Sequence, residues 1–597
     1  MRLSASPLQD GGGRHCLRRG RVGCALVAAV VVVAHLNALG GGFVFDDRVL
    51  VVGNPTLRSA RFIPRILGTN LWAFLGRSTN YYRPLPPLLL MAVAELFGLR
   101  PAVFHAVSLI LHAAAACLVT GLARRLLQTR AEAGEPVWGA ILAGLLFGVH
   151  PVNTESVAWI SGLVDVLGTF FSLLALYAHV RADGASAPWR WRLGACCAFA
   201  LALLSKEPAV AIFPVLLALD LTGPRDRRPG LRDALARWIP LVAVCAGYLA
   251  VRVQVLGGLA PARYGPAGSA GDGLVLLSRY LEKLLLPVHL SVVPEIPAAS
   301  SLSRMELLRV VSVLAVGVGL AVLLWRRGDR AARTGLLLAV LPLAPAIYAQ
   351  ALNRPELLAN RFAERHLYLS TAGWVLTVAS VTLSAARRSA ALRWVVTLSA
   401  AGWVLVFAAG TAVRDRVWRD EVTLWTDAVA KSPGVAEAHF KLGIALLERG
   451  DAAAGQRELR AGAGIDPGYV QQLFARARDD ERAGERRRGL AELRVVTMAL
   501  PGFAEGHFQL GRALATLGDA DAALAEYVVT LQLDPFHVEA ALLAARSLSD
   551  VGRAADAVRV LETAARLVPD DARIAVELEA VRRGCGASRT MGAPSDR

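Results

Sequence analysis

Stretches of apolar residues long enough to cross a lipid bilayer recur through the N-terminal part of this chain. Residues 24–39, 106–119 and 307–324 carry few or no charges. Each stretch approaches the roughly 20 residues that a helix needs to cross a hydrocarbon core about 30 Å thick. A soluble chain of 597 residues, 55% of them hydrophobic, would instead divide into several domains of lower mean hydropathy. The sequence therefore predicts a membrane protein with many spans.

Eleven apolar segments are predicted to cross the membrane, and the arginines between them set their direction. The segments are residues 23–41, 102–122, 137–150, 162–180, 192–204, 208–221, 238–256, 307–325, 334–350, 367–386 and 392–412. Arginine clusters precede the first segment and follow the second, fourth, sixth, eighth and tenth. All of these clusters fall on one side, which the positive-inside rule identifies as cytoplasmic. Residues 84–99 and 274–287 are also apolar, but a crossing by either would move later clusters outside, so both are expected in the outer interface.

A repeat of 34 residues follows the last apolar segment. Pro433, Pro467, Pro501, Pro535 and Pro569 are each 34 residues apart, which is the period of the tetratricopeptide repeat (TPR). AEAHFKLGIALLERGD at 436–451 aligns with AEGHFQLGRALATLGD at 504–519. Small residues stand where two helices of one repeat must touch, at Gly443, Gly511, Ala523, Ala545 and Ala557.

These patterns predict an all-α chain in four parts. Residues 1–22 form a cytoplasmic tail, 23–412 a multi-span membrane domain, 413–583 a TPR α-solenoid and 584–597 a disordered tail. With eleven crossings and a cytoplasmic N-terminus, the chain after residue 411 lies outside the cytoplasm. We therefore expect a multi-pass protein of the cell membrane with an extracytoplasmic TPR domain.

The charge and the cysteines exclude two other classes of protein. The net charge of +17 does not indicate a partner nucleic acid, because the arginines lie mainly in short loops beside apolar spans, where the positive-inside rule places them. The seven cysteines show no metal-ligand spacing, so neither a disulfide framework nor a zinc site is expected.

Two adjacent carboxylates, Asp46 and Asp47, come directly after the first span in FVFDD at 43–47. An Asp-Asp pair is ordinarily a solvated loop or a helix cap. Here it opens a long outer loop that ends in YYRP at 81–84. A carboxylate in this place can take a proton from an acceptor hydroxyl while a lipid phosphate departs.

Other polar groups stand where spans are predicted to meet the outer boundary. HPVNTE at 150–155 contains His150 and Glu155, which would otherwise be helix punctuation and an exposed acid. Asp165 lies just inside the next span, where a carboxylate is costly and should face protein or water. Lys206 in SKE at 205–207 is one of four lysines; it either snorkels or supplies a point charge to a lipid-linked phosphate.

AERHLYLS at 363–370 opens the tenth span with Glu364, Arg365 and His366. Capping and anchoring in the interface would also explain these three residues.

Seven strings occur in one order before the TPR array: FVFDD, YYRPL, FHAVSLILH (104–112), HPVNTESVAWISGLVD (150–165), LALLSKE (201–207), LEKLLLPVHLS (281–291) and AERHLYLS. In this combination the chain resembles the transmembrane and TPR repeat-containing O-mannosyltransferases, in a bacterial form. Those enzymes belong to the GT-C class, so the resemblance implies a GT-C-like membrane domain. The chain departs from the pattern at Pro86 and Pro87 and in a short Gly/Pro-rich loop around 257–272.

The resemblance implies inverting transfer of a sugar, with mannose expected, from a polyprenyl phosphate to Ser or Thr hydroxyls of a protein acceptor. The lipid-linked sugar is then a substrate, no cofactor is implied, and the requirement for a divalent metal stays open. The acceptor is expected in the groove of the TPR array. Two alternatives are a GT-C transferase that acts on a lipid or a cell-envelope polymer, and a non-catalytic membrane-anchored TPR scaffold.

The implied catalytic acid of the first outer loop maps onto Asp46 or Asp47, with Asp46 favoured as the base. Glu155 is a candidate for orienting the acceptor or the sugar. Candidates for binding the donor phosphate are Arg83, Lys206 and Arg365. Supporting roles are expected for His150, Asp165 and Glu364.

Overall fold

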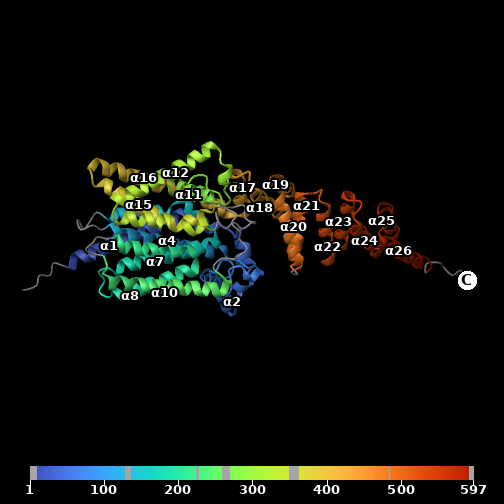
Figure 1. The fold of residues 1–597 in the computed structure, drawn as a ribbon, viewed down its shortest axis with the longest axis horizontal. Coiled ribbons are helices and arrows are strands. Elements are labelled where there is room, and N and C mark those ends of the chain that lie inside the picture. The colour runs from blue at the N-terminus through green and yellow to red at the C-terminus, as the bar shows by residue number, and fades with distance from the viewer. Residues whose placement is uncertain are drawn as a thin grey trace, which may run out of the picture. The chain divides into compact units, whose positions relative to one another are not determined.

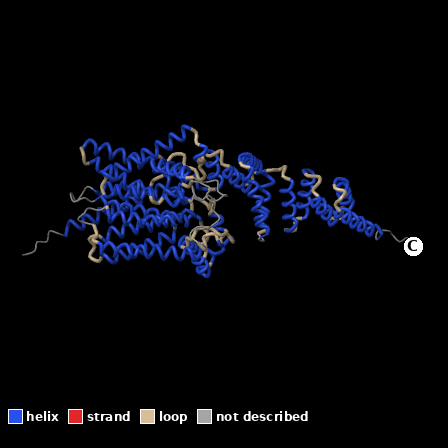
Figure 2. The backbone as a smooth tube through the Cα atoms, in the orientation of Figure 1, coloured by secondary structure: helices blue, strands red, loops and turns tan. Residues whose placement is uncertain are grey.

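The computed structural model describes residues 10–127, 136–222, 228–258, 269–348, 362–482 and 485–590. Within these ranges the chain consists of helices and loops, without a strand (Figure 2). It divides into two compact units, Met1–Ser432 and Pro433–Arg597. The predicted all-α class is therefore confirmed.

Each predicted span coincides with a helix of the first unit. The helices are α1 (Asp10–Ala34), α4 (Pro101–Leu127), α5 (Pro136–Gly148), α7 (Leu163–Ala182), α8 (Pro188–Ser205), α9 (Ile212–Leu221), α10 (Leu231–Leu256), α12 (Arg304–Arg327), α13 (Arg330–Val340) with α14 (Leu343–Ile347), α15 (Leu367–Ala386) and α16 (Ala390–Asp415). In the described part of the chain, seven helices are long and apolar enough to cross a membrane. An eighth is added if the pair Val137–Gly148 and Pro151–Ala158, bent by 45°, forms one span. Helices α1, α8 and α9 are shorter or less apolar than this measure requires, so the count of eleven stays a prediction.

Neighbouring apolar helices meet through close contacts at small residues. Gly144 of α5 lies against Thr120 of α4, and Gly148, one turn later, lies against Ala116, one turn earlier, so these helices are antiparallel. In Figure 1, α7 runs between α4 and α8, and α10 lies against α8. Helices α13 and α15 touch at their backbones, because a Cβ atom on Gly335 would meet the carbonyl oxygen of Gly373 at 2.5 Å.

The long loop after α1 folds into short helices that build a second hydrophobic core. These are η2 (Arg48–Val52), η3 (Pro55–Arg58), η4 (Ala60–Phe62), α2 (Ile63–Gly68) and η5 (Ala73–Leu75), followed by α3 (Leu85–Phe97). Leu57 and Ile66 of the loop pack with Met91 of α3 and with Leu163 and Leu167 of α7. This core fixes the loop on the start of α7. The other segment expected in the interface forms α11 (Ala270–Leu285).

The second unit is an array of helix pairs. Its helices are α18 (Ala436–Glu448), α19 (Ala452–Ile465), α20 (Pro467–Arg482), α21 (Arg486–Ala499), α22 (Ala504–Thr516), α23 (Ala520–Leu533), α24 (Val538–Asp550), α25 (Ala554–Leu567) and α26 (Ala572–Thr590). A Cβ atom on Gly443 would meet Leu459 at 2.8 Å, and one on Gly511 would meet Tyr527 at 2.7 Å. These glycines permit the close helix contact that the repeat predicted. Helix α26 extends into the stretch 584–597, of which residues 591–597 lie outside the described ranges.

The helix that precedes the array belongs to the first unit. It is α17 (Glu421–Lys431), and it follows α16 through the short helix η13 (Arg416–Arg419). Glu421 and its neighbours therefore pack with the residues of the first unit, although they lie beyond the last predicted span.

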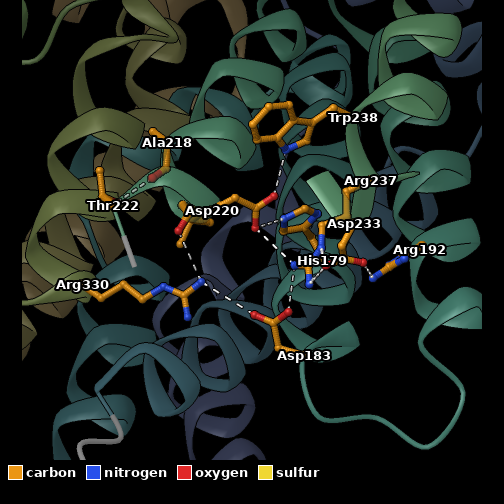
Figure 3. Close-up of polar contacts among 11 residues, drawn as sticks. His179, Asp183, Arg192, Ala218, Asp220, Thr222, Asp233, Arg237, Trp238 and Arg330 are labelled. Atoms are coloured by element: carbon orange, nitrogen blue, oxygen red, sulfur yellow. Dashed lines mark hydrogen bonds and ion pairs between the residues drawn. The ribbon is translucent and has the colours of Figure 1, made fainter. Parts of the chain in front are cut away.

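A buried polar network joins the ends of several helices near the arginine clusters (Figure 3). Asp220 of α9 is almost fully buried. Its carboxylate lies 3.0 Å from His179 Nε2 of α7 and accepts hydrogen bonds from Trp238 Nε1 at 2.9 Å and Arg237 Nη1 at 3.3 Å, both on α10. Arg237 also contacts Asp183 at 2.9 Å and Asp233 at 2.8 Å. We call this end of the bundle, where α7 ends, the arginine end.

Two of the three carboxylates of this network should differ in their effect on stability. Asp220→Asn removes the buried carboxylate that contacts His179 and Arg237, and breaking a buried pair costs about 3–5 kcal/mol. The side chain of Asp233 is 40% exposed, and exposed ion pairs contribute about 0–1 kcal/mol. Thermal unfolding of the purified protein in detergent should show a large fall in Tm for Asp220→Asn and a small one for Asp233→Asn. Equal falls in Tm for the two variants would contradict the conclusion that Asp220 lies at the buried centre of the network.

Candidate active site

Most of the candidate residues gather at the end of the bundle opposite the arginine end. Asp165 lies near the start of α7, whereas His179 lies near its end, and an α-helix rises about 1.5 Å per residue. We call this end, where α7 begins, the site end. The short loops before α7 and α15 and the loop after α1 all meet there.

The acid loop, residues 43–50, has an unusual backbone. Phe45 adopts a left-handed conformation with φ of 56°, which costs a residue with a side chain about 1–2 kcal/mol. Its N–H donates to Glu421 Oε1 at 2.8 Å. Its ring packs between Trp159 and Trp425, with centroids 5.4 Å from each. The loop therefore holds its strained conformation by contacts with two distant segments.

Asp47 is buried and turned into the protein. Its Oδ1 accepts hydrogen bonds from the backbone N–H of Ser161 at 2.7 Å and from Ser161 Oγ at 2.5 Å. Its Oδ2 accepts one from the N–H of Val44 at 3.2 Å. Burial raises the pKa of Asp47 to about 7, although these hydrogen bonds favour the ionised form. Asp47 thus fastens the acid loop to the helix η7 (Ile160–Gly162).

Asp46 is the more accessible of the two carboxylates, being half-buried. Its carbonyl oxygen accepts hydrogen bonds from the N–H groups of Val49 and Leu50 and so starts η2. Its carboxylate lies within electrostatic range of the Arg365 guanidinium. The structure therefore gives the adjacent acids different surroundings: Asp47 is buried and hydrogen-bonded, whereas Asp46 is half-buried.

Glu155 and Arg365 form a two-point contact. The Oε1 of buried Glu155 lies 2.5 Å from Arg365 Nη1, and its Oε2 accepts a hydrogen bond from the Arg365 backbone N–H at 3.0 Å. The guanidinium also lies over the ring of Trp159, 5.3 Å from its centroid. Glu155 lies on α6 (Thr154–Ala158), so this contact fixes the start of α15 to the segment after α5.

Lys206 and Arg365 line a crevice beside α7, together with Asp165 and His366. We call it the α7 crevice; it opens to solvent, and its cavity volume is about 20 Å³. Buried Lys206 forms an ion pair with Asp165. Neither ring nitrogen of His366 has a hydrogen-bond partner within the described residues, although both nitrogens are buried.

Three other candidates lie outside this crevice. Arg83 donates through Nε and Nη2 to Glu207 Oε2, at 2.9 and 2.7 Å, and lines a separate crevice in the long loop after α1. Glu364 accepts a hydrogen bond from the N–H of Ser291 at 2.8 Å. His150 lies 3.2 Å from the carbonyl oxygen of Leu284, so it joins the end of α5 to the end of α11. The predicted loop 351–366 is described only from residue 362 onward.

Sequence reasoning assigned no role to three residues that the structure places at the site. His366 was visible in AERHLYLS, but the sequence does not show that its ring nitrogens lack partners. Ser161 lies in an apolar stretch that carries no signal for a carboxylate partner. Glu421 is 376 residues away from Phe45 along the chain, and no local pattern joins the two.

The raised pKa of Asp47 predicts how stability depends on pH. An unfolded Asp titrates near 3.9, so between that pH and about 7 the folded protein binds more protons than the unfolded one. The contribution of Asp47 to the free energy of unfolding therefore falls as pH rises through this window, by up to about 1.4 kcal/mol per pH unit. Thermal unfolding from about pH 5 to pH 7 should show a smaller loss of stability in Asp47→Asn than in the wild type. Parallel curves would contradict the buried, proton-binding state.

Comparisons with known proteins point in one direction. Residues 83–250 match the family model described as dolichyl-phosphate-mannose-protein mannosyltransferase. A Caenorhabditis elegans protein O-mannosyl-transferase is 26% identical over 471 residues, which cover 75% of this chain and 63% of that protein. Human protein O-mannosyl-transferase TMTC4 is 27% identical over 495 residues, which cover 72% of this chain and 65% of that protein. Mouse protein O-mannosyl-transferase TMTC1 is 33% identical over 244 residues, which cover 38% of this chain and 25% of that protein. The chain thus spans less than two thirds of the length of these relatives.

Among solved structures, the archaeal oligosaccharyltransferase AglB from Archaeoglobus fulgidus aligns with this chain at 15% identity and a TM-score of 0.32. The alignment covers 78% of this chain and 59% of the AglB chain. Similarity of this size does not define a shared fold. The family model and the curated relatives together confirm the resemblance to the O-mannosyltransferases, while its bacterial form stays a prediction. The chain is therefore similar to the transmembrane and TPR repeat-containing (TMTC) O-mannosyltransferases.

Proposed function

We propose that this protein is a GT-C glycosyltransferase that moves one sugar, with mannose the expected sugar, from a polyprenyl phosphate to a Ser or Thr hydroxyl of a protein. The observation that carries the proposal is the grouping at the site end: half-buried Asp46 follows Phe45, whose ring packs on Trp159 beneath the Arg365 guanidinium, and Arg365 lines one crevice with Lys206. A base beside cations is what transfer from a phosphate leaving group requires. The names of the relatives, all protein O-mannosyl-transferases, support the same reaction.

The reaction forms one bond at the anomeric carbon, breaks another there and transfers one proton. The acceptor hydroxyl oxygen attacks the anomeric carbon of the sugar, and the bond from that carbon to the phosphate oxygen breaks with its electron pair on the phosphate. Asp46 takes the proton of the hydroxyl as general base. Arg365 stabilises the negative charge that grows on the departing phosphate, and Lys206 binds the charge that the donor phosphate already carries. Attack from the side opposite the phosphate inverts the anomeric carbon.

In this proposal the donor phosphate binds in the α7 crevice and its lipid chain runs along the membrane helices. Besides its charged residues, it is lined by Gly168, Thr169 and Ser172. With Asp165, these residues are spaced three to four apart along α7, so they share one face of the helix. The charged groups lie at one end of that face and the small, uncharged ones follow it toward the arginine end. We assign the phosphate to the charged end and the first part of the lipid chain to the rest.

The remaining candidates have supporting roles in this proposal. Asp47 fastens the acid loop, and Glu155 orients Arg365 rather than the acceptor. His366 offers a ring nitrogen to a phosphate oxygen or a sugar hydroxyl in the crevice. Arg83 acts from the second crevice through its pair with Glu207. His150 and Glu364 brace the segments around the site.

The topology completes the proposal. Eleven crossings would place the site end and the TPR domain on the non-cytoplasmic face, with the membrane domain at 23–412 and the solenoid at 413–583. The antiparallel packing of α4 and α5 and the placement of Asp165 and His179 at opposite ends of α7 support this arrangement. The groove of the array would then hold the acceptor chain.

Transfer assays on the purified full chain, with radiolabelled polyprenyl-phosphate mannose and a Ser/Thr-containing peptide, test the chemistry. Asp46→Asn should lower kcat by about 10²–10⁴-fold, since it keeps the volume and removes the base. Asp47→Asn should lower kcat much less, because Asp47 acts through the loop. Equal activity of wild type and Asp46→Asn would place the base elsewhere. Label found in lipid or polymer but not in peptide would favour the GT-C alternative, and no transfer from any donor would favour the scaffold.

A second pair of variants tests the phosphate site. Lys206→Ala removes a ground-state contact with the donor, so KM for the donor should rise more than kcat falls. The change also leaves Asp165 buried without its partner. The double variant Lys206→Ala, Asp165→Asn removes both charges and should keep the fold with the same raised KM. An unchanged KM in the folded double variant would exclude Lys206 from donor binding.

Reporter fusions test the topology. A reporter that is active only after export should be active when fused after residue 413 and inactive when fused after residue 388, at the arginine end. Activity in the opposite pattern would place the TPR domain in the cytoplasm and reverse the sides of the site.

A further inference from the structure

The conformation of Phe45 needs an explanation that its own segment does not supply. Among the described residues, only Phe45 and His289 combine a side chain with a positive φ. Left-handed backbone in a bulky residue persists only where the surroundings enforce it, and such residues gather at functional sites. Phe45 immediately precedes Asp46, so its φ and ψ set the direction in which Asp46 leaves the chain.

Glu421 supplies the enforcing contact. One of its carboxylate oxygens accepts the Phe45 N–H at 2.8 Å, and the other accepts Trp425 Nε1–H at 2.6 Å. Arg48, on the other side of the acidic pair, lies 3.5 Å from the same carboxylate. A carboxylate fits here because both oxygens face donors. A glutamine would turn an NH₂ group toward one of them.

Aromatic packing joins this contact to the cation of the site. The Phe45 ring lies between Trp425, which Glu421 holds, and Trp159, which lies beneath the Arg365 guanidinium. Trp159 in turn stacks on Trp418 at 6.0 Å. The acid loop is therefore packed against the same ring that supports the candidate phosphate ligand. A change in the Phe45 backbone would change the position of Asp46 relative to Arg365.

We propose that Glu421 is a positioning residue for the transferase reaction: it holds Phe45 in the left-handed conformation that aims Asp46 at the reacting groups. The inference rests on the proposed function. Glu421 opens α17, the helix that leads into the TPR repeats, so the residue that sets the acid loop belongs to the segment between the membrane helices and the array. The catalytic geometry then depends on a part of the chain that lies beyond the last span.

Hydrogen exchange tests the contact without requiring activity. In the full-length protein in detergent, Glu421→Ala should speed exchange of the Phe45 amide by about tenfold or more. Loss of the acceptor raises the equilibrium constant for local opening of this amide, and the exchange rate rises by the same factor. Lys431→Ala is the matched control. It removes the hydrogen bond from Nζ to the Leu290 carbonyl, 2.8 Å long, and so weakens the same helix without touching Phe45. Equal exchange at Phe45 in wild type and Glu421→Ala would overturn the proposal.

Kinetics test the positioning role. Glu421→Ala should lower kcat by roughly 10–100-fold, because a small misplacement of a catalytic group is costly, while KM for the donor stays unchanged. Lys431→Ala should lower Tm but keep kcat. In a Phe45→Gly background, Glu421→Ala should lower kcat by a smaller factor, since glycine adopts positive φ without a penalty.

Each result decides one point. The same loss of kcat in both backgrounds, or a rise in KM without a fall in kcat, would overturn the positioning role. If the wild type transfers no sugar, the proposed function fails, and the exchange experiment still shows whether Glu421 holds the loop.

Discussion

Charge pairing within the protein is the constraint on which the site end depends. Ionised groups beside or within membrane spans are costly unless each finds a partner. The structure meets this requirement with Glu155 and Arg365, with Asp165 and Lys206, and with Glu207 held between Arg83 and Arg252. These pairs join segments that are far apart in the sequence. Because removing one member strands the other, each pair fixes the relative placement of two helix ends.

The features that could be predicted from the sequence are those with a local period. A helix that crosses a membrane must be apolar along its whole length, so each predicted span is matched by a helix such as α4 or α12. The 34-residue repeat reports contacts between neighbouring helices, and Gly443 and Gly511 lie at the close contacts expected of them. The same reasoning selected the segments that carry the candidate site, because a polar residue at the end of an apolar span is conspicuous.

The partners of those polar residues could not be predicted in the same way. Nothing near FVFDD shows that Asp47 accepts its hydrogen bonds from Ser161, or that Phe45 donates to Glu421. Arg83 was grouped with Lys206 and Arg365 because all three are cations at the predicted outer boundary. The structure places Arg83 against Glu207 and in a different crevice. Side-chain pairing depends on how the helix ends converge, which the period of the sequence does not encode.

The balance of charge in the α7 crevice bears on how a lipid phosphate would bind. Lys206 is paired with Asp165, and Arg365 is paired with Glu155, so the crevice carries no large net charge before the donor arrives. An unpaired cation in this place would be expensive to bury. A donor phosphate would therefore share both cations with their carboxylate partners. This pairing lowers the free energy of the protein without donor, and it also limits the affinity of the crevice for the product phosphate. Of the polar side chains that line the crevice in the described residues, His366 has two buried ring nitrogens and Ser172 a buried hydroxyl without partners. In the proposed function, either group could bind the phosphate or the sugar without disturbing the two ion pairs.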